Sequence, residues 1–135
     1  MKQAVIESGR AEFALNAVKN VVAGKNEKAK KEYKSYAKKF PTLVLANGLA
    51  AAVAFAVDKG GSYAIVYNNI SDWLIKSGYF ANPTRLEEYV CAMSSDEYRV
   101  VTNEVLALLE WLKRFASGLI EGDADDLIEG DANEG

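Results

Sequence analysis

The stretch SSDEYRVVTNEVLALLEWLKRFA, residues 94–116, decides the fold of this chain. Ser94 and Glu97 form a Ser-x-x-Glu capping box, which satisfies the free amides at the start of a helix. Apolar side chains then recur every three or four residues, at Val101, Val105, Leu108, Leu109, Leu112, Phe115 and Leu119. This spacing predicts one long helix that ends near Gly118 and buries one face in a core.

A second strip on the same predicted helix carries Glu104, Ala107, Trp111 and Arg114. An acid, a base and a large aromatic residue together indicate either a contact with a partner or a lock between neighbouring helices. For Trp111 we favour packing at a helix crossing, with Arg114 reaching towards Glu110 or Glu104. Glu104 and Trp111 are our candidate residues for a partner interface.

The rest of the chain predicts an all-α fold, a single-domain bundle of about six helices, because no segment alternates like a strand. Before the last helix we expect helices over Lys2–Val22, over Asn26–Phe40, from Pro41 to the end of an apolar run at Val57, from Ser62 to Gly78, and a short one from Asn82-Pro83. The third of these is apolar on nearly every side, so we expect it to be the central helix. Gly48 lies within it, where it would let neighbouring backbones come close.

The 135 residues predict one helical domain, residues 1–120, followed by an acidic tail, residues 121–135. The tail holds 7 of the 19 acids and no base, and the sequence LIEGDA occurs at 119–124 and again at 127–132. This density of charge and glycine predicts a disordered segment. Without the tail, 16 bases face 12 acids, a net charge of +4, which favours a partner of negative charge.

Lysines cluster on the second predicted helix. With Tyr33 at the centre of its buried stripe, the opposite half carries Lys28, Lys31, Lys34, Lys38 and Lys39. Such a face can follow a phosphate backbone without reading bases, and the alternative is an ordinary solvated surface. We predict RNA contact through Lys31, Lys34, Lys38, Lys39, Arg99, Lys113 and Arg114.

The last predicted helix, with Tyr98, Glu104, Trp111 and Arg114 in these positions, resembles the small helical subunit of Cmr complexes, the type III-B CRISPR effectors that recognise RNA through a guide. A second block is also similar to that family: Tyr33-Lys34-Ser35-Tyr36, then Phe40-Pro41-Thr42-Leu43, then Asn47-Gly48-Leu49. Together the two blocks extend the resemblance over the region up to residue 118.

The resemblance implies a non-catalytic structural subunit that serves antiviral defence in the cytoplasm. Copies of such a subunit stack head to tail into a short filament beside larger guide-binding subunits, which cut the target RNA. The implied partners are other Cmr subunits, further copies of this chain, and the backbone of guide and target RNA. A helical adaptor that binds only protein is the alternative function.

The residue types needed for catalysis are missing. The chain has no histidine, which excludes Ser-His and Cys-His nucleophiles and almost every catalytic zinc site. Its one cysteine, Cys91, adjoins an apolar stripe and is expected in the core, and a single cysteine fits a reducing cytoplasm. The longest apolar run, Leu43–Val57, has 15 residues, fewer than the ~20 of a membrane span. We therefore expect no enzyme, no metal or other cofactor, no small-molecule substrate and no membrane.

Overall fold

The computed structural model describes residues 2–81 and 84–122, with side chains from Gly9 onward. These residues form six α-helices and no strand, which confirms the predicted all-α class. The helices are α1 (Lys2–Gly24), α2 (Glu27–Asn47), α3 (Leu49–Lys59), α4 (Ser62–Lys76), α5 (Leu86–Ala92) and α6 (Ser95–Leu119). Of the predicted acidic tail, only Glu121 and Gly122 lie within the described residues.

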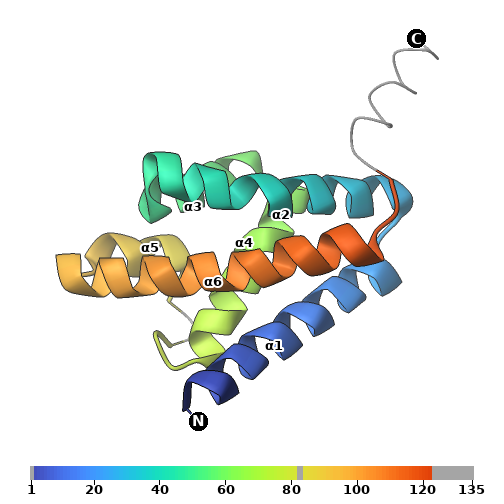
Figure 1. Cartoon of the computed structure of the whole chain (residues 1–135). Coiled ribbons are helices and arrows are strands. Elements are labelled where there is room, and N and C mark those ends of the chain that lie inside the picture. The colour runs from blue at the N-terminus through green and yellow to red at the C-terminus, as the bar shows by residue number, and fades with distance from the viewer. Residues whose placement is uncertain (1, 82–83, 123–135) are drawn as a thin grey trace.

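The central helix of the bundle is α6. It lies between α1 and the α2–α3 pair, and α4 crosses behind it (Figure 1). Its first turn is capped as predicted by Ser94, whose Oγ accepts a hydrogen bond from the amide of Glu97 at 3.2 Å. The expectation that the apolar segment up to Val57 is central is wrong, because α3 buries only one face and leaves Val57 exposed.

The sequence predicts that α2 ends before Pro41, and this boundary is wrong. The helix continues through Pro41 to Asn47. A proline inside a helix removes one backbone hydrogen bond and crowds the preceding turn. Here Pro41 is buried together with Phe40 and Val44, and the burial of these side chains offsets that cost.

The break between α2 and α3 falls at Gly48, which was predicted to lie inside one helix. Its backbone adopts φ 92° and ψ 159°, a region open essentially to glycine alone. Glycine has no side chain with which to cap α3. The amide of Ala50 donates instead to the hydroxyl oxygen of Tyr98 on α6, 2.9 Å away. The role of Gly48 is therefore to turn the chain between two helices.

The short helix α5 begins at Leu86, whereas Asn82 and Pro83, which were predicted to open it, lie outside the described residues. Leu86 and Val90 are buried as expected. Cys91 is exposed, so its predicted place in the core is wrong. The reason is that Cys91 projects about 100° away from Val90 around the helix. Across the described residues, no helix combines the length and apolar character that a bilayer span requires.

Candidate nucleic-acid interface

The stripe of α2 that packs against the bundle fixes which way its lysines point. Asn26 caps the helix through its side-chain oxygen, which accepts a hydrogen bond from the amide of Ala29 at 2.8 Å. Tyr33 is fully buried and donates its hydroxyl to Asn69 Oδ1 of α4, also at 2.8 Å. These contacts set the rotation of α2 about its axis, so the opposite half of the helix faces outward.

We call four lysines on that outward half the α2 lysine face: Lys28, Lys31, Lys38 and Lys39. Three of them are exposed and Lys31 is half-buried. None of the four pairs with a carboxylate of residues 9–81 or 84–122. The two acids of α2 have other contacts, since Glu27 pairs with Lys30 at 2.5 Å and Glu32 accepts a hydrogen bond from the Tyr36 hydroxyl at 3.2 Å. The charge of Lys31 also acts on Glu27, so the two acids of α2 balance only part of the positive charge of the face.

Lys34 lies beside the α2 lysine face and has a structural contact. Its ammonium group donates to the backbone carbonyl oxygens of Ile120 at 3.0 Å and Gly122 at 2.9 Å, just beyond α6. The last carbonyl groups of a helix lack partners within the helix and carry partial negative charge, so a cation stabilises them. Lys34, which we predicted to contact RNA, thus caps the end of α6.

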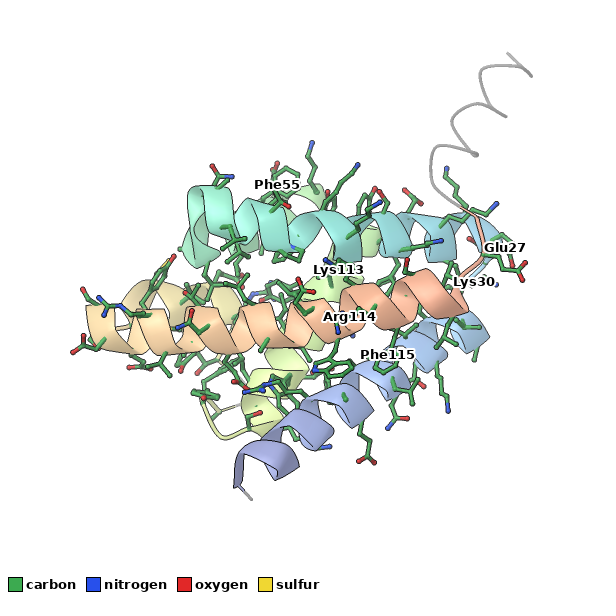
Figure 2. All side chains as sticks on the ribbon, viewed as in Figure 1. Glu27, Lys30, Phe55, Lys113, Arg114 and Phe115 are labelled. Atoms are coloured by element: carbon green, nitrogen blue, oxygen red, sulfur yellow. The ribbon has the colours of Figure 1, made fainter. Side chains whose placement is uncertain are left out.

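Lys113 lies on the neighbouring helix α6, on the side that faces α2 (Figure 2). α2 and α6 run antiparallel, because Lys34 near the start of α2 meets the end of α6, while Tyr98 near the start of α6 meets Ala50 beyond the end of α2. Lys113 precedes Ile120 by seven residues, about 10 Å along α6. It is therefore level with the middle of α2.

The two arginines predicted to bind RNA lie apart from this surface. Arg114 projects about 100° from Lys113 around α6. It stands over the ring of Trp111, 5.9 Å from the ring centre, and lies 4.0 Å from Glu110, which also pairs with Lys113 at 3.4 Å. Arg99 is exposed about 21 Å from Lys113 along the helix, where it lines an open groove of about 600 Å³ between α3, α5 and α6.

Glu104, a candidate for the partner interface, is only 9% exposed and lies inside the bundle. Arg10 of α1 donates to both of its carboxylate oxygens, from Nε at 3.1 Å and from Nη2 at 2.8 Å. Trp73 of α4 donates from Nε1 to the same carboxylate at 2.9 Å. One carboxylate on α6 thus ties three helices together.

Opposing effects act on the pKa of Glu104. Burial raises it, whereas the hydrogen bonds from Arg10 and Trp73 and the charge of Arg10 lower it, and the lowering prevails. We did not predict Arg10 as a partner, although the sequence carries a signal for it. Arg10 interrupts the apolar stripe of α1 just as Glu104 interrupts that of α6, and buried charges require partners.

Trp111, the second candidate for the partner interface, is half-buried. It stacks on Phe115, with the ring centres 5.7 Å apart. Phe115 lies on the side of α6 that faces α1 (Figure 2). Trp111 therefore packs beside the α1–α6 contact and keeps part of its indole at the surface.

Comparisons with known proteins agree with one another. The family model described as CRISPR-associated protein (Cas_Cmr5) matches residues 6–119. The CRISPR system Cmr subunit Cmr5 of Thermus thermophilus is 34% identical over 110 residues, which are 81% of this chain and 93% of that protein. The crystal structure of a CRISPR-associated Cmr5 family protein from Thermus thermophilus is similar with a TM-score of 0.74 at 31% identity, and the match covers 86% of this chain and 98% of that one.

Proposed function

The chain belongs to the Cmr5 family of CRISPR-associated proteins, and from this premise we propose that it is a structural subunit of a type III-B Cmr effector complex in the cytoplasm. In this proposal, copies of the chain stack into a short filament beside the guide-binding subunits. The filament supports the duplex of guide and target RNA, while other subunits cut the RNA. The observation that carries the RNA contact is the excess of positive charge on the α2 lysine face, which the acids of α2 balance only in part.

The α2 lysine face suits the backbone of RNA better than its bases. From Lys28 to Lys39 it extends about 16 Å along α2, enough to follow several phosphates of one strand. Lysine ammonium groups contact phosphates as point charges and do not select a sequence. A guided complex needs this kind of contact, because base pairing with the guide already reads the sequence. Lys113 on the neighbouring helix is paired with Glu110, so it adds little to this charge.

The side chains present support a subunit without catalysis of its own. The chain has no histidine. Among the described residues, no three acidic or cysteine side chains gather closely enough to hold a metal ion. Metal-assisted cleavage of RNA needs such a group of ligands. The proposed division of labour therefore leaves the chemistry to other subunits of the complex.

Large apolar side chains at the surface support contacts with other protein chains. Leu45 on α2 is 73% exposed and Val100 on α6 is 54% exposed. The same two residues support a second candidate function, a helical adaptor that binds only protein. In that case the lysines serve only to keep the protein soluble.

Charge reversal on α2 separates the two functions. The test variant combines Lys31→Glu, Lys38→Glu and Lys39→Glu, and it leaves Lys34 in place because Lys34 caps α6. Glutamate forms helices about as well as lysine, so the variant should fold. Binding of single-stranded target RNA to the guide-loaded complex should weaken. The slope of log affinity against log salt should become shallower by about 0.7 for each lost phosphate contact.

The matched control reverses three exposed lysines outside the face, Lys19 of α1, Lys59 of α3 and Lys76 of α4. It changes the net charge by the same amount, so a difference between the variants reports position. Circular dichroism first establishes that both variants are folded at the assay temperature. If the α2 variant binds RNA as well as the control does, the lysine face is only solvated and the protein-binding adaptor is the better function.

A further inference from the structure

The residues that follow α6 contact α2 directly. Lys34 holds the carbonyl oxygens of Ile120 and Gly122, at 3.0 and 2.9 Å. Gly122 has a φ of 78°, a left-handed turn that glycine adopts without strain. The segment after Gly122 therefore starts next to Lys34, one helical turn from Lys31 and from Lys38.

A strip of side chains runs along α2 from this point. Lys31, Lys34, Lys38 and Leu45 project within an arc of about 60° around the helix. Leu45 is 73% exposed, the highest value among the large apolar side chains of the described residues. It follows Lys34 by about 16 Å along the helix. The strip thus begins with positive charge and continues to an exposed apolar side chain.

The sequence after Gly122 has the complementary pattern. Residues 123–135 hold six acids and no base, and the apolar pair Leu127-Ile128 lies between the acids. An extended chain advances at most about 3.3 Å per residue, so Leu127 can reach about 16 Å from Gly122. This reach equals the distance along α2 from Lys34 to Leu45. Charge and apolar character therefore match at the same spacing.

We propose that residues 123–135 dock on this strip of the same molecule, with Asp123 beside Lys31, Asp125 beside Lys38 and Leu127-Ile128 on Leu45. The covalent link gives the tail a high effective concentration, so weak ion pairs suffice. The docked tail competes with RNA for the α2 lysine face, a consequence that rests on the proposed function. The family model matches the chain only up to residue 119, so the proposed competition with RNA comes from a segment that the family model does not cover.

The rate at which lysines react with an amine-acetylating reagent tests the docking without RNA. The full-length protein is compared with a variant whose six tail acids from Asp123 to Glu134 are replaced by the corresponding amides, and mass spectrometry quantifies each lysine. At about 0.02 M salt, Lys31 and Lys38 should react about threefold more slowly in the parent, a change that one exposed ion pair can produce. The difference should disappear at about 0.5 M salt, where charges are screened. Lys59 and Lys76 serve as internal controls.

Equal rates at low salt would overturn the docking. Protection of Lys31 and Lys38 that grows with protein concentration would place the tail on a second copy, and it would overturn docking within one molecule. The same two proteins are then compared for affinity to a single-stranded RNA. Protection of the lysines, together with tighter RNA binding by the variant whose tail acids are replaced by amides, supports both the docking of the tail and its competition with RNA. Protection with unchanged RNA affinity supports the docking and refutes an RNA role for the face, so failure of the two proposals can be distinguished.

Discussion

Replacing Gly48 with alanine tests the turn between α2 and α3. Its φ of 92° and ψ of 159° cost a non-glycine residue about 1–3 kcal/mol. The new Cβ would also lie 3.1 Å from the hydroxyl oxygen of Tyr98. That oxygen accepts the hydrogen bond from Ala50, and weakening this bond adds about 1 kcal/mol. Gly48→Ala should therefore lower the free energy of unfolding by roughly 2–4 kcal/mol.

Thermal unfolding followed by circular dichroism measures this loss. For a domain of this size, 1 kcal/mol changes the melting temperature by about 3–6 °C, so we expect a fall of roughly 6–24 °C. Gly118→Ala is the matched control. Gly118 lies inside α6, has no positive φ, and meets nothing within 4 Å of an added Cβ. Alanine there should leave stability unchanged or raise it by up to about 1 kcal/mol.

The variant Tyr98→Phe separates backbone strain from the close contact. Without the hydroxyl oxygen, the Cβ of an alanine at position 48 has nothing to displace. The double variant Gly48→Ala/Tyr98→Phe should therefore lose less stability than the sum of the two single variants. A melting temperature of Gly48→Ala equal to that of Gly118→Ala would contradict this prediction, because the turn between α2 and α3 would then not require glycine.

Three further outcomes concern the ion pair, the tail and catalysis. Glu104→Gln should lower the free energy of unfolding in urea by about 2–4 kcal/mol, because the mostly buried Arg10 loses its charged partner. Glu110 pairs with Lys113 and Arg114 at the surface, so the control Glu110→Gln should change this free energy by less than about 1 kcal/mol. The pKa of Glu104 is lower in the folded than in the unfolded chain. Its contribution to stability is therefore present above the unfolded pKa of about 4.3 and is lost as the pH falls through the folded pKa. The difference in free energy of unfolding between the parent and Glu104→Gln should accordingly close below about pH 4. At about 0.5 M salt, truncation after Gly122 should leave the melting temperature nearly unchanged, and a fall of more than a few degrees would show that the tail is part of the folded domain. The purified protein should not cleave RNA with Mg²⁺ or Mn²⁺, and cleavage that co-elutes with it and is lost on substitution of a single acid would contradict a structural role.

The helices could be predicted because their signals are local. Ser94 caps α6 through the amide of Glu97, three residues away, and apolar spacing marks the buried faces. Pro41 misled the prediction because proline is over-represented at the first position of a helix and is costly inside one. Only the tertiary packing around Pro41 and Val44 shows that α2 continues past it. The turn at Gly48 has the same cause, since an isolated glycine in an apolar run does not reveal its φ.

The residues of the candidate site also fall into those that could be predicted from the sequence and those that could not. The α2 lysine face was predictable because it requires only the helical period and one buried residue, Tyr33. The contacts of Lys34 and Glu104 were not, since their partners lie 86 and 94 residues away in sequence, at Ile120 and Arg10. Opposite charges on two apolar stripes indicate that a pair exists, but not which helices meet.

The distribution of charge on α2 favours the proposal that its lysine face binds a ligand. On an ordinary solvated helix, lysines alternate with acids three or four residues away, and each such pair stabilises the helix by about 0.2–0.5 kcal/mol, while like charges at these spacings destabilise it by similar amounts. On α2, Lys31, Lys34 and Lys38 follow one another at such spacings. Glu27 pairs with Lys30 and offsets only part of the charge of Lys31, and Glu32 accepts a hydrogen bond from Tyr36. The contact of Lys34 with the end of α6 removes only part of this repulsion. A polyanion laid along the face would remove the rest, whether it is an RNA backbone or the chain's own acidic tail.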